Sequence, residues 1–434
     1  MHPSQPTPLP YLTTTPGLHG ELKKRIADFY VEEVLPNGEV CRIEQLDKDP
    51  PQRVPIVIPE NPNPRKFDQL HIWMEKFNTE TTFAIRNLSR GTGCSIKRIG
   101  YAGLKDKRGI TCQRISLWQP NVEKLKGFMV KGMALHHASW SAQRLDLGDL
   151  RGNKFTITIR NIPFTTEEIE TRMETFRQQI LHGVPNYYGE QRFGGFRNIT
   201  HRVGKLLLQN KIEEGIMLYL TSPSEGEEDF ARVAREHLAA THDFDAALRE
   251  YPLNCHFERA MIAHLQTDPK DFLGAFRRLP PKTRYLFTHA YQSDLFNQVV
   301  AERLRRKLMY PIEGDILEGG IPTAPLVGSK TTRAKGLAGE IEASVLDKEH
   351  LSPSLFWHDD VPELSSFGTR KPMLLKIHDF QWNEIGDDEF NPGKQKVQVK
   401  FWLDKGVYAT SALRELLKET TRENNEKEEN VEEN

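Results

Sequence analysis

The chain has 434 residues, which predicts a globular protein of two or three domains. Hydrophobic residues make up 38% of it and charged residues 27%, and the formal net charge is −1. These values exclude a disordered chain and a globally basic nucleic-acid binder, although they leave local patches open. No run of 18 apolar residues occurs, so we expect no membrane span.

The first half of the chain contains both strand and helix patterns. Residues 28–34 (DFYVEEV) and 155–159 (FTITI) predict strands. Helical apolar spacing occurs in the second half of residues 71–88, and a helix over residues 166–181 is predicted with Thr166 as its N-cap. Residues 49–64 hold six prolines in sixteen positions and therefore predict a loop.

The composition changes near residue 210. Residues 222–229 (SPSEGEED) predict an acidic loop, and several polar helices are expected from there to Arg278. Residues 287–307 predict a long amphipathic helix. The Gly- and Pro-rich residues 318–328 are expected to form a loop against a sheet edge.

The C-terminal part returns to strand alternation at residues 397–403 (VQVKFWL). Thr410 and Ser411 are candidate N-caps for a helix that reaches about Lys418. Residues 422–434 contain six Glu against one Arg and one Lys, and predict a disordered tail.

Charge is distributed unevenly along the chain. Residues 1–210 carry 30 Lys and Arg against 21 Asp and Glu, a net of +9, whereas residues 211–434 carry a net of −10. Residues 81–160 hold 15 basic and 4 acidic side chains, a net of +11. Such a stretch suits phosphate neutralisation, and the alternative is a solvated basic surface without a partner.

The densest candidate for chemistry is residues 95–118, SIKRIGYAGLKDKRGITCQRISLW. Asp106 is the one carboxylate among six Lys and Arg side chains, and nearby positive charge favours its ionised form. An ionised Asp106 could act as a nucleophile or a general base. On spacing alone, a β-turn in which Lys-Asp-Lys faces water is the favoured interpretation.

Two further stretches combine residue types that bind nucleic acids. Residues 183–196 (GVPNYYGEQRFGGF) place aromatic rings beside Arg192 and glycines, which suits an unstacked base but also a loop whose aromatics fill the core. Residues 404–415 (DKGVYATSALRE) lead into a helix with small residues at its start, which suits an anion or ordinary capping.

Other common motifs are missing from the sequence. It contains no nucleotide-binding Gly-rich loop, no H-E-x-x-H and no G-x-S-x-G, and its four cysteines form no C-x-x-C pair. His136 and His137 are adjacent, so on a strand they should face opposite ways and suit one metal poorly. A cofactor-free enzyme acting on RNA and a non-catalytic RNA-binding protein are the interpretations that remain.

The three stretches together resemble the TruD family of pseudouridine synthases, the tRNA pseudouridine-13 synthases. The family pattern AGxKDKxxxTxQ appears as AGLKDKRGITCQ (residues 102–113) and NY[FY]GxQRFG as NYYGEQRFG (residues 186–194). ATSxLREL appears as ATSALREL (residues 409–416), and weaker matches include SDLFNQVVAERL (residues 293–304). The resemblance covers essentially the whole chain in the same order.

The resemblance implies an α+β fold. A catalytic domain of pseudouridine-synthase type, with a mainly antiparallel mixed sheet and flanking helices, would be interrupted by an inserted family-specific α/β domain. We therefore expect the catalytic domain in residues 1–210 and 370–421, the inserted domain in residues 211–369, and the tail in residues 422–434.

The resemblance also implies the reaction and its residues. Uridine in RNA, by family default uridine 13 of tRNA, would be isomerised to pseudouridine by Asp106, without a cofactor, nucleotide or metal. Lys23 would lie near the active site, Asn186 and Tyr188 would position the aspartate and stack on the uracil, and Arg192, Phe193 and Arg414 would support the pocket.

Two rival functions stay open at this point: the same chemistry on another RNA, such as a small nuclear or messenger RNA, and a binding-only homologue. The cysteine usage and the lack of a signal sequence predict a cytoplasmic protein, or a nuclear one in a eukaryote. Protein partners cannot be inferred from the sequence.

Overall fold

The computed structural model describes residues 8–47, 54–224, 226–383 and 385–418. These residues form two compact units, each built from separate stretches of the chain. The sheet unit contains residues 13–184 and 375–418, and the helical unit contains residues 8–12 and 185–374. The predicted tail (422–434) lies outside the described residues, as does part of the predicted loop at 49–64.

The sheet unit is organised around one mixed sheet, which has nine strands among its described residues. The strand order is β12-β14-β6-β1-β4-β2-β5, with β13 paired to β14 and β3 paired to β4. The strands are β1 (Phe29–Val34), β2 (Gln69–Phe77), β3 (Ile99–Tyr101), β4 (Ile110–Trp118), β5 (Met133–Ser141), β6 (Gly152–Ile162), β12 (His378–Trp382), β13 (Gly386–Asp387) and β14 (Gln395–Asp404).

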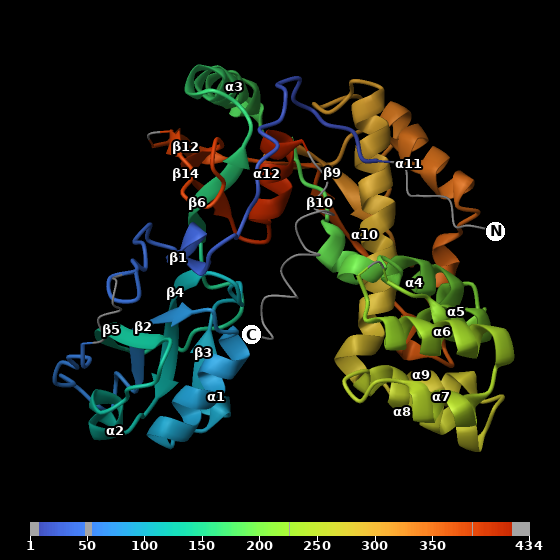
Figure 1. The fold of residues 1–434 in the computed structure, drawn as a ribbon, viewed down its shortest axis with the longest axis horizontal. Coiled ribbons are helices and arrows are strands. Elements are labelled where there is room, and N and C mark those ends of the chain that lie inside the picture. Colours follow the sequence, from blue (N-terminus) through green and yellow to red (C-terminus); the bar gives the residue numbers. More distant parts are fainter. Residues whose placement is uncertain (1–7, 48–53, 225, 384, 419–434) are drawn as a thin grey trace. The chain divides into compact units, whose positions relative to one another are not determined.

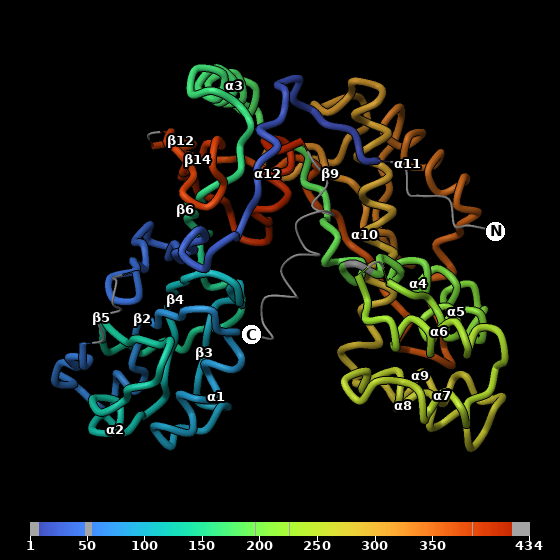
Figure 2. The backbone as a smooth tube through the Cα atoms, in the orientation of Figure 1, coloured from blue at the N-terminus to red at the C-terminus, as the bar shows by residue number. Residues whose placement is uncertain are grey.

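Strand β1 joins the two halves of this sheet. It runs parallel to β4 and antiparallel to β6, and the other pairings among the described strands are antiparallel. The C-terminal strands β12 and β14, red in Figure 2, lie beside β6 although they are far from it in sequence. The last part of the chain therefore completes the sheet that the first part begins.

Four α-helices pack on this sheet in the described part of the unit. They are α1 (Thr81–Thr92), α2 (Val122–Lys126), α3 (Thr166–Gln179) and α12 (Ala409–Leu417). Helices α1 and α2 bury Leu88 and Leu125 against the side of the sheet formed by β2 and β4. Helices α3 and α12 bury residues such as Phe176 and Leu413 against β1, β6 and β14.

The helical unit is built around the long helix α10 (Figure 1). Its other helices are α4 (Thr200–Leu208), α5 (Ile212–Thr221), α6 (Asp229–Thr241), α7 (Phe244–Glu250), α8 (His256–Thr267), α9 (Phe272–Arg277) and α11 (Gly336–Lys348), and α10 spans Pro281–Arg305. A small antiparallel sheet is formed by β8 (Leu317–Glu318), β9 (Ile321–Leu326) and β10 (Thr369–Pro372). Strands β7 (Val184–Pro185) and β11 (Leu374–Leu375) form a separate pair.

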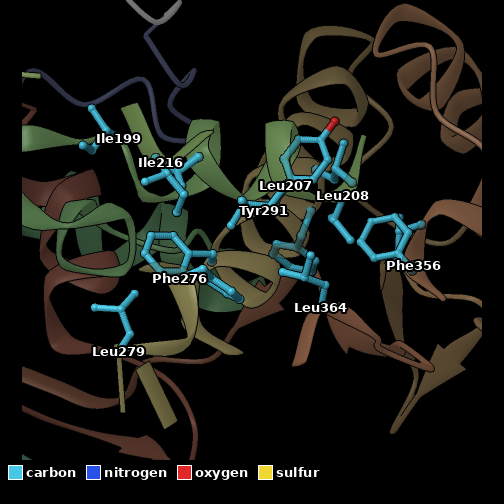
Figure 3. Packing of buried hydrophobic residues seen from close by; sticks show 14 of the residues in the cluster. Ile199, Leu207, Leu208, Ile216, Phe276, Leu279, Tyr291, Phe356 and Leu364 are labelled. Carbon is cyan, nitrogen blue, oxygen red and sulfur yellow. The ribbon is translucent and has the colours of Figure 1, made fainter. Parts of the chain in front are cut away.

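A single hydrophobic core holds the helical unit together. Figure 3 shows part of it, with Leu207 and Leu208 of α4 close to Tyr291 of α10. Helix α4 approaches α10 closely because residue 204 is a glycine: a Cβ there would lie 2.1 Å from the Phe287 carbonyl oxygen. This packing assigns α4 to the helical unit, although the predicted inserted domain starts only at residue 211.

The α+β fold that the sequence predicts is confirmed, as are its main strands and helices. Three local predictions are wrong. Helix α3 is capped by Thr165 and not by Thr166, because the Thr165 hydroxyl accepts the Glu168 N–H at 3.3 Å. Helix α12 starts directly after Tyr408, ahead of both predicted caps. The region predicted as a loop at residues 318–328 contains the whole of β9.

A further difference concerns the length of α10. Helix α10 begins at Pro281, six residues before the predicted start, because a proline fits the first turn of a helix. Throughout the described ranges, no helix is long and apolar enough to cross a bilayer.

Candidate active site

Asp106 lies in the loop that joins the antiparallel strands β3 and β4. Its side chain is 41% exposed, and its neighbour Lys107 is exposed as well. Lys105, on the other side of Asp106, points into the protein and has a side chain only 3% exposed. The Lys-Asp-Lys sequence is therefore not a turn whose three charges all face water.

Lys105 is held by a buried ion pair. Its Nζ atom lies 2.7 Å from Oε2 of Glu33 on β1, whose side chain is fully buried. The other carboxylate oxygen of Glu33 accepts the backbone N–H of Arg114 on β4 at 3.2 Å. A buried charge needs a partner of this kind, so the pair fixes the loop on the parallel strands β1 and β4.

Hydrogen bonds also hold the backbone of the Asp106 loop. The Thr81 hydroxyl, at the start of α1, accepts the N–H of Lys105 at 3.1 Å and contacts Oε1 of Gln113 at 3.2 Å. The Gln113 side chain in turn donates to the Gly103 carbonyl at 2.9 Å. The loop around Asp106 is thus fixed on both sides by residues of the AGLKDKRGITCQ motif and of α1.

Lys23 is the charged partner of Asp106. Its Nζ atom lies 3.2 Å from Oδ1 of Asp106 and 4.2 Å from the centroid of the Phe29 ring. The Lys23 backbone is left-handed (φ 56°), which is uncommon for this residue type. Arg108 stabilises this conformation because its Nε–H donates to the Lys23 carbonyl at 3.0 Å. Lys23 and Asp106 thus lie side by side in the sheet unit, and the role predicted for Lys23 stays a prediction.

A second lysine near Asp106, Lys76, has no signal in the sequence motifs. Its side chain is almost fully buried, and its Nζ atom donates to the carbonyl oxygens of Thr79 at 2.9 Å and of Asp106 at 3.5 Å. Burial, together with the positive charge of Lys105, lowers the pKa of Lys76 to about 8. Lys76 is therefore a buried lysine of lowered pKa beside the backbone of the candidate catalytic residue.

The NYYGEQRFG segment lies in the helical unit, where α10 holds it. The Asn297 side chain makes two hydrogen bonds with the backbone of Tyr188: its Oδ1 accepts the N–H and its Nδ2 donates to the carbonyl, both at 2.9 Å. The Nε–H of Arg192 donates to the Ser293 hydroxyl at 2.9 Å. Ser293 and Asn297 both belong to the SDLFNQVVAERL match, so two sequence motifs meet here.

Tyr188 is half-buried and its ring contacts several charged and aromatic groups. Arg192 lies 5.4 Å from the ring centroid, Lys371 lies 3.9 Å from it, and Phe296 packs edge-on at 5.6 Å. Burial, together with the positive charge of Arg192, lowers the pKa of Lys371 to about 7. Like Lys76, Lys371 carries no motif signal that could have identified it from the sequence.

Asn186 and Phe193 are both buried in this segment. The Asn186 amide donates to the Pro372 carbonyl at 3.0 Å, and its Oδ1 finds no hydrogen-bond partner among the described residues. Phe193 packs edge-on against His201, with ring centroids 5.0 Å apart. Phe193 is therefore a core residue of the helical unit.

Arg414 lies on α12 in the sheet unit. One of its terminal nitrogens is 3.4 Å from Oε1 of the buried Glu415, whose Oε2 accepts the N–H and hydroxyl of Thr13. Of the predicted site residues, Lys23 and Asp106 come together in the sheet unit, and Asn186, Tyr188, Arg192 and Phe193 come together in the helical unit. Arg414 belongs to a separate cluster with Glu415.

Comparisons with known proteins identify the family to which the chain belongs. The model of the family described as "tRNA pseudouridine synthase D (TruD)" matches residues 9–320 and 318–416. A Methanosarcina barkeri protein with the name tRNA pseudouridine synthase D is 35% identical, over 94% of this chain and 95% of its own. A Methanopyrus kandleri protein of the same name is 38% identical, over 80% and 84%.

A solved structure agrees with these sequence matches. The crystal structure of a Methanosarcina mazei protein, with TruD in its title, superimposes with a TM-score of 0.78 at 34% sequence identity. The match covers 94% of this chain and 96% of that one. The similarity therefore extends over both units and every motif discussed above.

Proposed function

The chain belongs to the TruD family and is a tRNA pseudouridine synthase, and we propose that it isomerises uridine 13 of tRNA with Asp106 as its catalytic carboxylate. The enzyme class rests on similarity along nearly the whole chain. The position in tRNA, the role of Asp106 and the independence from a cofactor go further and belong to the proposal. The predicted cytoplasmic location stays a prediction.

The reaction itself explains why one carboxylate is sufficient. The C1′–N1 bond of uridine breaks, the uracil turns, and a C1′–C5 bond forms, while the hydrogen on C5 is replaced by one on N1. Atoms and electrons balance within the nucleoside, so no oxidant, reductant or group donor is consumed. An ionised carboxylate can attack the sugar or base as a nucleophile or remove a sugar proton as a base.

The observation that carries the proposal is the contrast between Asp106 and its neighbour. Lys105 is anchored in the interior by Glu33, whereas Asp106 is presented half-exposed with Lys23 at 3.2 Å. A rigid loop that exposes one paired carboxylate is what a positioned catalytic group requires. The contact with Lys23 would hold the Asp106 side chain in one orientation for the ribose.

The NYYGEQRFG segment of the helical unit supplies aromatic and basic groups that suit a base taken out of its stack. Extrusion of a uridine costs a few kcal/mol, which stacking and phosphate contacts must offset. We assign stacking on the uracil to Tyr188, whose backbone is fixed by Asn297, and the positioning of Asp106 to Asn186. Arg192 and Phe193 support this segment, and Arg414 supports the start of the chain through Glu415.

A direct test uses unmodified tRNA transcript and position-resolved mapping of pseudouridine. Asp106→Asn keeps the shape of the side chain but removes its charge, so turnover should fall by about 10²–10⁴-fold or more. Asp146→Asn is the matched control because Asp146 is an exposed aspartate of the same unit, and its turnover should stay at the wild-type level. Turnover that survives in Asp106→Asn would refute the catalytic assignment.

The rival functions give different results in the same experiment. Pseudouridine at another tRNA position, or only in small nuclear or messenger RNA, would support the proposed reaction but refute the proposed substrate. Binding of RNA by the wild type without any product would favour a binding-only homologue.

A further inference from the structure

A bulge in strand β5 brings two adjacent histidines to the same place. In the pairing of β5 with β2, His71 faces Ser139 and Trp73 faces His136, so two residues of β5 oppose one residue of β2. His137 lies in this bulge and has a left-handed backbone (φ 49°). The ring centroids of His136 and His137 are 5.0 Å apart, which corrects the prediction that the two side chains face opposite ways.

A carboxylate from the segment after β1 meets both rings. Oε1 of Glu44 lies 3.1 Å from Nε2 of His137, and Oε2 of Glu44 lies 3.6 Å from Nδ1 of His136. One ligand atom from each of these three residues lies within 4.8 Å of the other two. Ligand atoms on a tetrahedral Zn²⁺ ion, each about 2.0–2.2 Å from the metal, are roughly 3.3–3.6 Å apart. The two separations, which involve different oxygens of Glu44, lie close to that range.

The buried histidine is already oriented as a metal ligand. Nε2 of His136 lies 2.9 Å from Oε1 of the fully buried Glu75, which fixes the orientation of the ring. Its Nδ1 is buried and has no hydrogen-bond partner among the described residues. A buried ring nitrogen without a hydrogen-bond partner, 3.6 Å from a carboxylate oxygen, is placed to share a cation with that carboxylate.

Glu75 also places the third ligand. Its carboxylate accepts the backbone N–H of Glu44 at 2.7 Å and that of Leu46 at 2.8 Å. One buried carboxylate thus fixes both His136 and the segment that carries Glu44. Carboxylate–histidine pairs of this kind are the usual outer support of zinc ligands.

We propose that Glu44, His136 and His137 bind a Zn²⁺ ion, with Glu75 as the positioning residue. Two imidazoles and one carboxylate form a His₂Glu set, and they suit Zn²⁺ better than the all-oxygen ions Mg²⁺ and Ca²⁺. Glu44 and His137 are 46% and 47% exposed, so water can reach a fourth position. Trp73 stacks on His137 with centroids 4.1 Å apart and holds that ring in place.

The site would tie the segment after β1 to the edge strand β5. It lies within the sheet unit and takes no part in the proposed isomerisation, so the two proposals can fail independently. The metal would act as a structural clip, and Zn²⁺ should raise the melting temperature of the full chain.

Calorimetric titration of the chelator-treated full-length protein with Zn²⁺ tests the site, with Mg²⁺ titrated in parallel. The wild type should bind one Zn²⁺ at this site, at least tenfold more tightly than Mg²⁺. His137→Ala and Glu44→Gln each remove one exposed ligand, so each should weaken Zn²⁺ binding at least tenfold and abolish the rise in melting temperature. Both residues are half-exposed, so these variants keep the buried His136–Glu75 pair intact.

His237→Ala is the matched control. His237 also faces a carboxylate, Glu250, at 2.8 Å, and both side chains are similarly exposed at 43% and 40%. It lies in the helical unit and is not part of the Glu44–His136–His137 group, so Zn²⁺ affinity should not change. Equal weakening in His237→Ala and His137→Ala, unchanged affinity in Glu44→Gln, or equal affinity for Mg²⁺ would overturn the proposal.

Discussion

Replacement of Lys105 by Met tests whether the loop around Asp106 depends on a buried ion pair. The change keeps the length of the side chain but leaves the fully buried Glu33 without its cation at 2.7 Å. At that distance, and with an effective dielectric constant of 20, the attraction is about 6 kcal/mol. Glu33 retains the N–H of Arg114 and can take up a proton, so we expect a net loss of about 3–5 kcal/mol.

The loss can be measured selectively in the sheet unit. Five of the six tryptophans lie there, and Trp357 is the one in the helical unit. In a Trp357→Phe background, fluorescence therefore reports on unfolding of the sheet unit alone. A loss of about 3–5 kcal/mol should move the urea midpoint down by roughly 1–2 M.

Lys107→Met is the matched control, because Lys107 is the same residue type two positions away and is exposed. Its effect on the free energy of unfolding should stay within about 0.5 kcal/mol. Equal midpoints for the two variants would refute the reasoning that Lys105 and Lys107 have opposite roles in the motif.

Three further predictions follow from the site and the charge distribution. Burial lowers the pKa of Lys76 to about 8, so between about pH 8 and 10.5 the unfolded chain binds more protons than the folded chain. The free energy of unfolding should therefore rise with pH in this range. The rise should be smaller in Lys76→Met, which lacks the titrating group. Asn297→Ala removes both hydrogen bonds to the Tyr188 backbone and should lower kcat/KM for tRNA about tenfold, whereas Arg305→Ala on the same helix should not. The binding constant for tRNA should fall tenfold or more between 50 and 200 mM salt, roughly the range in which phosphate contacts are lost, and a flat response would exclude residues 81–160 from the RNA path.

The order of elements could be predicted from the sequence because their patterns are local. The strand at residues 397–403 and the helix over residues 166–181 have clear periodicity, and both are present as β14 and α3. Residues 318–328 were misassigned because prolines and glycines there suggested a loop. Two of those prolines lie within β9, which pairs with β10 across more than forty residues of sequence.

The candidate site could be predicted only where a motif marks it. Asp106 and Lys23 stood out through charge and resemblance, and their ion pair brings them together. Lys76 and Lys371 could not be identified, because their chemistry depends on burial that the packing of distant elements produces. The convergence of His136 and His137 was missed for a related reason, since a one-residue bulge reverses the alternation on which the prediction relied.

Burial also changes what the basic stretch at residues 81–160 can offer to RNA. The net charge of +11 counts every cation of the stretch as available to phosphates. Two of these cations, however, pair with carboxylates that lie outside the stretch. Lys105 is neutralised by Glu33, and Arg160 lies 2.9 Å from Asp28 and 3.0 Å from Asp388. These two cations face carboxylates in the interior and have no free charge for phosphates. The salt dependence of tRNA binding should therefore correspond to fewer phosphate contacts than the eleven net charges in the sequence, with exposed cations such as Lys107 contributing and Lys105 and Arg160 not.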